Sequence, residues 1–439
     1  MEPEIKSKNK GMKFLIIMVI IILLATIGGL VFLVLNNSEN EPTGNIVTNE
    51  EIINEIIENT VVGNVVVPND LKEYPMIGNG QIAEEKSAYY DRNKERAVIP
   101  TGYAVLNDSP NIADGLVISD IANDNMANQM GGNQFVWIPV AVPYIDVTGQ
   151  LEDTAINNRI QEYIDVGYYP MAIKLKDDNY ASILYNFRLG GGGTRVSVAL
   201  SKYTSEASEG NREPQNVVTD GNIRIRNWED DLFQKEYNDM VEAVIADGGF
   251  WIARFETSIN DNNIAQSKRG QEAVFYKTWY DLYDIANSLS NNITKTHMIW
   301  GCQWDQTMIF LAMEGNKYAT EGARFYILNG TGKGNFAEYE TELTKAPKDN
   351  PDAIIKLKNE IKHLPTGFDD EFQVKSIYDL AGNLWEWTME GTYETSRAMR
   401  GGFCGYNGSQ SAAAREYVKP DYYGERIADF GTRMVLYEN

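Results

Sequence analysis

A glutamate between two tryptophans, near the end of the chain, constrains the fold more than any other feature of the sequence. After the turn Ala381–Asn383 the chain reads Trp385-Glu386-Trp387. In a strand the two indoles share one face and Glu386 takes the other. Indoles on one face are typical of a buried strand, and a buried carboxylate without a partner is costly. We therefore expect Glu386 to pair with an arginine. The nearest candidates along the chain are Arg397, Arg400, Arg415 and Arg433.

Short apolar runs separated by Gly, Asn, Asp and Pro predict short strands through much of the chain. Such strands are expected at Leu116–Ser119, Phe135–Pro139, Gly249–Phe255 and Phe430–Tyr437. Apolar residues at helical spacing predict a few helices. These are expected at Glu50–Val62, Thr278–Leu289 and Trp304–Met313. The fold class that follows is α+β, with short strands, few helices and much irregular chain.

The composition excludes some classes of function. The chain has 439 residues, of which 43% are hydrophobic and 11% aromatic, so it can form a packed core. Its 62 acidic and 39 basic residues give a net charge of −23. A nucleic-acid backbone would repel such a chain, and no basic patch is visible, so we expect no nucleic-acid partner. With two histidines, a histidine-rich zinc or iron centre is nearly excluded.

The apolar stretch Phe14–Leu35 predicts a membrane anchor. Its 22 residues carry no charge, which is enough to cross the roughly 30 Å of a bilayer core. Lysines precede it, at Lys6, Lys8, Lys10 and Lys13. This bias predicts a single-pass protein in the cell membrane, with a cytoplasmic N-terminus and an extracytoplasmic C-terminal domain. A cleaved signal peptide is the competing interpretation, although Asn36-Asn37-Ser38 is a poor cleavage site. A pilin-type leader fits less well, because the apolar run lacks an acidic residue.

Changes in composition along the chain predict its domain organisation. Polar residues and turn signals predict a stalk between the anchor and a globular domain. The expected parts are a tail at 1–13, the anchor at 14–35, a stalk at 36–95 and a domain at 96–439. Two long polar stretches of that domain are predicted insertions, at about 150–247 and 315–372.

Several segments of the globular domain resemble the formylglycine-generating enzyme family, also called the sulfatase-modifying factor domain. The family tail reads roughly G-L-Y-D-M-x-G-N-V-W-E-W, then R-V-x-R-G-G-S-W, then R and finally G-F-R. The segments of this chain that carry the resemblance, in the same order as in the family, are Phe135–Pro139, Phe250–Glu256, Ile299–Asp305, Ile377–Trp387, Arg397–Phe403, Arg415 and Phe430–Arg433. The resemblance covers about residues 96–439, interrupted by the two insertions.

The resemblance implies a C-type-lectin-like fold and a structural role for its most recognisable residues. In this interpretation the charged and aromatic positions of the carboxyl-terminal motifs form the framework. These are Trp385, Glu386, Trp387, Arg400, Arg415 and Arg433.

Catalysis is the less favoured implication. The oxidases of the family use two cysteines just past the R-G-G motif to bind copper, and thiolates suit Cu(I). This chain has Cys404 there, directly after Phe403, and no second cysteine follows. Cys302 matches neither family position. A copper-dependent formylglycine-generating oxidase using Cys404 and Cys302 is the alternative hypothesis. Sequence alone leaves open whether the two cysteines pair in a disulfide or are separate buried residues.

The favoured hypothesis is a non-catalytic ligand-binding protein at the cell surface, recognising a protein or a glycan. In the binding branch of the superfamily the segment after R-G-G is displayed outward, and here it is rich in Tyr, Ser and Asn, which suit adaptable binding loops. The candidate ligand-binding residues are Tyr406, Asn407, Ser409, Gln410, Ser411, Tyr417, Asp421, Tyr422 and Tyr423. A solvated loop that binds nothing, in a purely structural surface protein, is the third interpretation. Calcium binding by Asp- and Asn-rich loops stays open, since no spacing specifies a site and the metal is unknown.

Overall fold

The structure is a computed structural model, and the chain divides into two units, Met1–Ile57 and Glu58–Asn439. All residues that the structure describes belong to the second unit. They are 59–62, 65–68, 71–106, 111–122, 131–147, 153–174, 179–186, 197–201, 216–219, 222–225, 232–312, 334–338, 359–391, 396–406, 411–422 and 430–438. The predicted tail and anchor lie outside these residues. The predicted domain boundaries stay predictions.

An antiparallel six-stranded sheet, in the order β17-β24-β14-β7-β6-β5, is the largest sheet of the described chain. The strands are β5 Ala104–Val105, β6 Val117–Ser119, β7 Gln134–Pro139, β14 Gly249–Ala253, β17 Thr294–Met298 and β24 Met434–Glu438. Every side chain of β14 is buried, so this strand lies in the interior of the unit. The predicted strands at Leu116–Ser119, Phe135–Pro139 and Gly249–Phe255 are confirmed as β6, β7 and β14.

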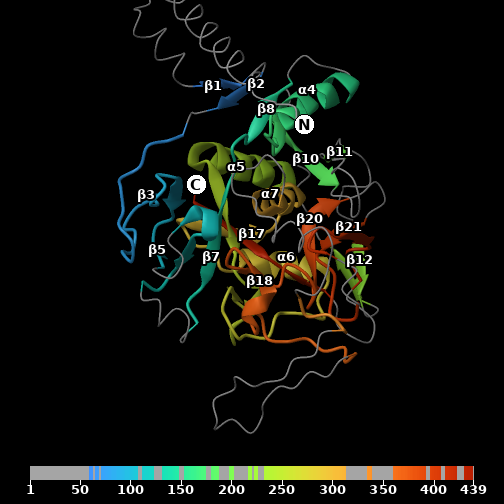
Figure 1. Ribbon diagram of the computed structural model, residues 1–439. Coiled ribbons are helices and arrows are strands. Elements are labelled where there is room, and N and C mark those ends of the chain that lie inside the picture. The colour runs from blue at the N-terminus through green and yellow to red at the C-terminus, as the bar shows by residue number, and fades with distance from the viewer. Residues whose placement is uncertain are drawn as a thin grey trace, which may run out of the picture. The chain divides into compact units, whose positions relative to one another are not determined.

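A second sheet, in the order β22-β21-β20-β23, contains the carboxyl-terminal motifs. Its strands are β20 Trp385–Gly391, β21 Arg397–Arg400, β22 Arg415–Val418 and β23 Phe430–Thr432. Strands β20 and β23 pair in parallel, and the other pairs are antiparallel. Figure 1 shows this sheet at the red end of the chain.

A third sheet, in the order β11-β10-β9-β8, and helix α4 come from the first predicted insertion and the residues before it. The elements are β8 Tyr144–Asp146, α4 Asp153–Asp165, β9 Ala172–Lys174, β10 Tyr180–Asn186 and β11 Ser197–Ser201. Their apolar side chains form a small core of their own, which includes Ile145, Ile160, Ile173 and Ile183. Ile309 of helix α7 belongs to the same core, so the insertion packs against the main body of the unit.

Three further helices cover the sheets, with bounds α5 Leu232–Asp247, α6 Trp279–Asn287 and α7 Gly301–Ala312. Helix α5 contacts β14, α6 contacts β17, and α7 contacts β7 and β10. Helix α6 begins with a capping box: the Thr278 hydroxyl accepts from the Asp281 backbone N–H, and the Asp281 carboxylate accepts from that of Thr278. The predicted helix at Thr278–Leu289 is confirmed as α6, and α7 begins one turn earlier than the sequence predicts.

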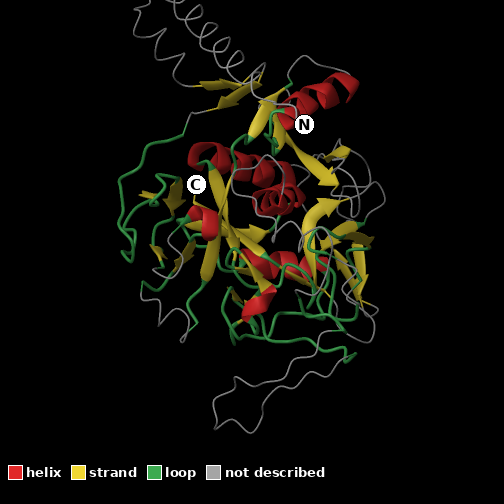
Figure 2. Cartoon of the chain, in the orientation of Figure 1, coloured by secondary structure: helices red, strands yellow, loops and turns green. Residues whose placement is uncertain are grey.

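Short hairpins complete the described chain, and Figure 2 shows few helices among many short strands and loops, which confirms the α+β class. The hairpin strands are β1 Asn59–Val62, β2 Val65–Pro68, β3 Ser87–Tyr90, β4 Arg96–Ile99, β12 Asn216–Thr219, β13 Asn222–Ile225, β15 Ser258–Ile259, β16 Ala265–Gln266, β18 Gln373–Val374 and β19 Ile377–Tyr378. Two short 3-10 helices lie at Ile112–Asp114 and Asp370–Phe372.

Two predicted elements need correction. The run Phe430–Tyr437 is not one strand: it divides at Arg433 into β23 of one sheet and β24 of another. The guanidinium of Arg433, at the point of division, is fully buried and pairs with Glu386. The predicted helix Glu50–Val62 is wrong at its end, because Asn59–Val62 is extended and pairs with Val65–Pro68. β-branched valines at five of these positions favour a hairpin there.

The predicted single-pass membrane localisation is overturned for the described chain. No helix in this part of the protein combines the length and the apolar character that a membrane span requires. The longest of the described helices, α5, has 16 residues and contains Lys235, Glu236, Asp239 and Glu242. At 1.5 Å per residue it falls short of a roughly 30 Å bilayer core. The stretch Phe14–Leu35 itself lies outside the described residues.

Candidate functional site

Arg433 is the arginine that the structure places beside Glu386. Its Nε donates to Glu386 Oε2 at 2.8 Å and its Nη2 to Glu386 Oε1 at 2.6 Å, a bidentate pair. The remaining donors reach the carbonyl oxygens of Ala253 and Tyr378, at 3.0 and 2.9 Å. Arg433 therefore joins β14, β19 and β20 from inside the core. Trp385 and Trp387 are both buried, as expected of an interior strand.

Two more buried carboxylates surround this pair. Glu256 accepts from the backbone N–H of Leu384 and the side-chain amide of Asn383. Asp379 accepts from the backbone N–H of Gly367 at 2.8 Å. Burial raises the pKa of Glu386 above its ordinary value, although Arg433 acts against it. Burial and the neighbouring carboxylates also raise the pKa of Glu256. One guanidinium thus balances a region that holds three carboxyl groups.

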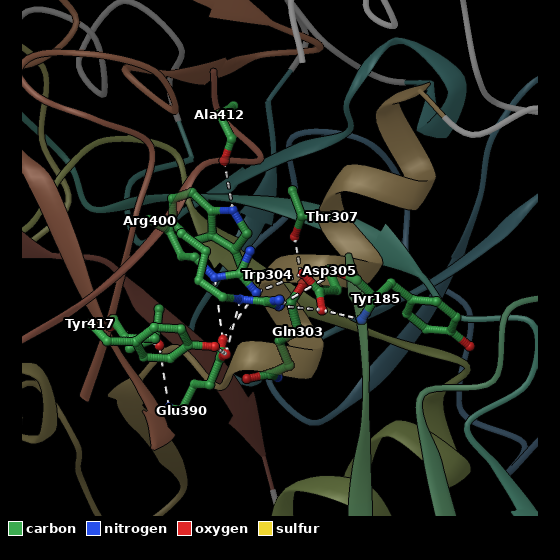
Figure 3. Close-up of polar contacts among 12 residues, drawn as sticks. Tyr185, Gln303, Trp304, Asp305, Thr307, Glu390, Arg400, Ala412 and Tyr417 are labelled. Carbon is green, nitrogen blue, oxygen red and sulfur yellow. Dashed lines mark hydrogen bonds and ion pairs between the residues drawn. The ribbon is translucent and has the colours of Figure 1, made fainter. Parts of the chain in front are cut away.

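A second group of buried charges, which we call the ionic cluster, consists of Asp305, Glu390, Arg400 and Arg415. Arg400 Nη2 lies 2.8 Å from Asp305 Oδ1 and 3.0 Å from Glu390 Oε2. Arg415 Nη2 lies 3.2 Å from Asp305 Oδ2, and its Nε lies 2.9 Å from Glu390 Oε1. Each arginine therefore bridges both carboxylates. Figure 3 shows the side chains of Asp305, Glu390 and Arg400 converging.

The elements that carry the ionic cluster come from distant parts of the sequence. Asp305 lies in α7, Glu390 in β20, Arg400 in β21 and Arg415 in β22. Asp305 Oδ2 also accepts from the backbone N–H of Tyr185 in β10, at 2.8 Å. The cluster therefore connects the carboxyl-terminal sheet, helix α7 and the insertion.

Glycine at position 301 makes room for the cluster. A Cβ atom there would lie 2.8 Å from both Cβ and Oε2 of Glu390 and 3.1 Å from Leu184 Cδ2. Any larger residue would displace the Glu390 carboxylate.

The electrostatics of the cluster favour full ionisation of Glu390. Burial acts to raise its pKa, but Arg415 and Arg400 outweigh burial, and the pKa lies below its ordinary value. Burial raises the pKa of Asp305 despite the same two arginines. With two positive and two negative groups the cluster is neutral as a whole. Such a neutral, hydrogen-bonded group is suited to fixing a geometry rather than to proton transfer.

The predicted ligand-binding residues take different positions around the cluster. Tyr417 is 43% exposed, and its hydroxyl donates to Glu390 Oε1 at 2.9 Å. Tyr422 is 37% exposed, with its ring 5.5 Å from that of Phe430. Tyr406 is half-buried, whereas Ser411 is 1% exposed and its side chain points inside. The candidates Asn407, Ser409, Gln410 and Tyr423 lie outside the described residues.

The sequence interpretation missed Asp305 and Glu390, although weak signals for both were present. Glu390 follows Glu386 in the same strand, at an even spacing that would place both carboxylates on one face of a regular strand, although the pairing of β20 with β21 shifts register between Trp387 and Gly391. A second buried carboxylate implies a second arginine, and Arg400 and Arg415 fill that role. Asp305 stands at the end of the segment Ile299–Asp305, but its sequence position alone does not reveal its partners.

The two cysteines are buried and are not joined by a disulfide. Cys302 Sγ lies 3.6 Å from the Tyr237 hydroxyl, and burial raises the pKa of its thiol to about 12. The backbone N–H of Cys404 donates to the Asn383 carbonyl at 3.1 Å. A thiol that stays protonated is a poor ligand for copper, because the thiolate is the binding form. Within the described chain no three His, Cys, Asp or Glu side chains are grouped to hold a metal ion.

His363 should make the protein sensitive to mild acid. Its ring lies 5.0 Å from that of Phe275, and burial lowers its pKa from 6.5 to about 4. The unfolded chain takes up the proton first, so stability is complete above pH 6.5 and is lost as the pH falls toward 4. Between pH 7 and pH 5 the wild type should lose about 2 kcal/mol more than His363→Phe. Denaturant unfolding at both pH values tests this, and equal losses would contradict it.

Comparisons with known proteins find distant likenesses among solved structures. No family model and no curated protein match the sequence. Among solved structures, the crystal structure of CarF shows 15% identity and a TM-score of 0.29, covering 44% of this chain and 87% of its own. The major tropism determinant, U1 variant, shows 8% identity and a TM-score of 0.27, covering 83% of this chain and 99% of its own. Likenesses with TM-scores this low carry no argument about fold or function.

Proposed function

We propose that this chain is a non-catalytic ligand-binding protein with a C-type-lectin-like fold of the sulfatase-modifying-factor type. In this proposal the segment that follows the R-G-G motif, residues 403–423, carries recognition. The observation that carries the proposal is the attachment of β22 to the ionic cluster. Two buried carboxylates hold Arg415 and the Tyr417 hydroxyl, while the Tyr417 ring stays 43% exposed.

Rigid support of exposed tyrosines is what a binding surface requires. Tyrosine offers a large contact area and few rotatable bonds, so little entropy is lost when it meets a ligand. The hydrogen bond to Glu390 fixes the Tyr417 ring before any ligand arrives, which lowers the cost of binding further. Tyr422 contributes a second exposed ring on the same segment.

The fold part of the proposal is supported by the positions of the motif residues. Glu386 pairs with Arg433, and the Trp387 ring lies 5.4 Å from that of Phe430, so residues of different motifs meet in the core. That is the arrangement expected if these motifs form a framework. The copper-oxidase alternative receives less support, because the Cys302 thiol is buried, has a raised pKa and contacts the Tyr237 hydroxyl.

Exposed tyrosines of this segment should carry the affinity for the ligand. The full chain would be applied to a glycan array and to a random peptide library, alongside Tyr417→Ala, Tyr422→Ala and Tyr90→Ala. Tyr90 is a matched control, because it is 45% exposed and lies in β3. We expect a retained ligand whose binding falls about tenfold in the first two variants and is unchanged in the third. Thermal unfolding would verify that all variants are folded.

Two outcomes would contradict the proposal. In the first, neither the array nor the library retains a ligand. In the second, Tyr90→Ala weakens binding as much as the segment variants do.

A further inference from the structure

Lys86 and Asp247 form an ion pair with little access to solvent, at the end of helix α5. Lys86 Nζ lies 2.9 Å from Asp247 Oδ2, and the two side chains are 13% and 9% exposed. Lys86 directly precedes β3, and Asp247 is the last residue of α5. The negative end of the helix dipole lies there, so a carboxylate at this position is unfavourable. A residue that breaks a local rule in this way is a candidate for a functional role.

Further hydrogen bonds fix both members of the pair. The Tyr74 hydroxyl donates to Asp247 Oδ1 at 2.8 Å, on the oxygen that Lys86 does not contact. Lys86 Nζ also donates to the backbone carbonyl of Glu438, at 2.8 Å. Arg96 Nη1 donates to the backbone carbonyl of Asp247, at 2.9 Å. The amine and the carboxyl group are therefore held against each other from several sides.

The surroundings favour the uncharged form of the carboxyl group. Burial raises the pKa of Asp247 above its ordinary value and outweighs the opposing effects of Lys86 and Arg96. The end of the helix dipole acts in the same direction as burial. A proton that passes from the ammonium to the carboxylate leaves a neutral amine beside a carboxylic acid. These are the two forms that can condense with each other.

We propose that Lys86 and Asp247 condense to an amide, an isopeptide bond that the folded protein forms by itself. After the proton transfer, Nζ of Lys86 attacks Cγ of Asp247, so a C–N bond forms. The C–O bond to one carboxyl oxygen then breaks, and that oxygen leaves as water with two protons that came from the nitrogen. An ammonium and a carboxylate thus give an amide and one water molecule. No oxidant, reductant or other reactant is needed.

The neighbouring groups would assist this condensation. The Tyr74 hydroxyl donates to Oδ1, where negative charge develops when the nitrogen attacks, so it stabilises the tetrahedral intermediate. The Glu438 carbonyl accepts from Nζ and orients the amine toward Cγ. Exclusion of water protects the product from hydrolysis.

The Lys235–Asp239 pair in α5 is a matched control. Its Nζ–Oδ2 distance is 2.7 Å, but 69% of the Lys235 side chain is exposed. Water therefore solvates the ammonium and keeps it charged. Among the described residues no hydroxyl group donates to Asp239. We expect this pair to remain an ordinary ion pair.

Intact-mass spectrometry of the full chain tests the proposal. The wild type should be lighter than its sequence by the mass of one water molecule, and a digest should contain one branched peptide that joins Lys86 to Asp247. Lys86→Arg should have the full mass of its sequence, whereas Lys235→Arg should keep the deficit. In cell-free synthesis, sampled over time, Tyr74→Phe should accumulate the cross-link at least about tenfold more slowly than the wild type.

Two results would overturn the proposal. A wild type with the full mass of its sequence would mean that Lys86 and Asp247 remain an ion pair, and this measurement decides even if Lys86→Arg does not fold. A deficit that persists in Lys86→Arg would mean that water is lost elsewhere, for example in a cyclic imide at Asp247-Gly248. Equal rates for Tyr74→Phe and the wild type would overturn the role of Tyr74.

Discussion

Replacing Arg433 with methionine should destabilise the protein by about 3–5 kcal/mol, enough to leave a marginally stable protein largely unfolded. Methionine fills much of the volume but donates no hydrogen bond. Glu386 would then be a buried carboxylate without its bidentate partner, next to Asp379 and Glu256. The carbonyl oxygens of Ala253 and Tyr378 would each lose a donor as well.

Denaturant unfolding of the full chain, followed by tryptophan fluorescence, measures this effect. Arg92→Met is the control, since Arg92 is exposed, and it should change stability by less than about 0.5 kcal/mol. The double variant Arg433→Met/Glu386→Met should recover part of the loss, because it removes the uncompensated charge. A loss below about 1 kcal/mol for Arg433→Met would mean that the pair does not hold the core together.

Local patterns in the sequence predicted local structure well. The alternation of Gly249–Phe255 and the helical spacing of Thr278–Leu289 led to β14 and α6, because both depend on neighbours a few residues apart. The buried carboxylate at Glu386 was also predictable, since two indoles on one face are typical of an interior strand, whose other face is often covered as well. The need for an arginine followed from the energetics of burial alone.

The partner of Glu386 could not be predicted, because it depends on how distant strands pair. Four arginines were available, and the choice of Arg433 follows from a chain that leaves one sheet at Thr432 and enters another at Met434. A single apolar run such as Phe430–Tyr437 does not reveal this division. The ionic cluster is a stronger example, since its four residues are assembled by α7, β20, β21 and β22.

Surface properties were the least predictable. Composition placed Ser411 among the ligand-binding candidates, yet its side chain is buried. It also included Tyr417 without any sign that Glu390 would hold its hydroxyl. Both depend on the path of the chain and not on residue type.

The variant Asp305→Ala should cost about 3–5 kcal/mol and should also reduce ligand binding. Without the carboxylate, Arg400 and Arg415 are left with Glu390 alone, so the buried cluster gains a net positive charge. The backbone N–H of Tyr185 loses its acceptor at the same time. A buried donor left unsatisfied adds about 1–3 kcal/mol to the cost.

Asp261→Ala serves as the control, because Asp261 is exposed in the turn between β15 and β16. It should shift stability by less than about 0.5 kcal/mol. The conservative variant Asp305→Asn keeps the shape of the side chain but places an amide N–H against a guanidinium. It should therefore be destabilised nearly as much as Asp305→Ala. If Asp305→Asn were as stable as the wild type, charge at this position would not matter, and the ionic cluster would be held by packing alone.

The binding measurement separates two roles of the cluster. The carboxylates of the cluster hold Arg415 in β22, the strand that also presents Tyr417. The cluster could act only on the stability of the fold, or it could also orient the binding surface. The two roles predict different ligand affinities for a folded variant. At a temperature where Asp305→Asn is still folded, an orienting cluster predicts weaker binding of the ligand that the array or the library retains. Unchanged binding would limit the cluster to stabilising the fold. Weaker binding together with a lost cooperative unfolding transition would mean that the variant has lost its native structure as a whole.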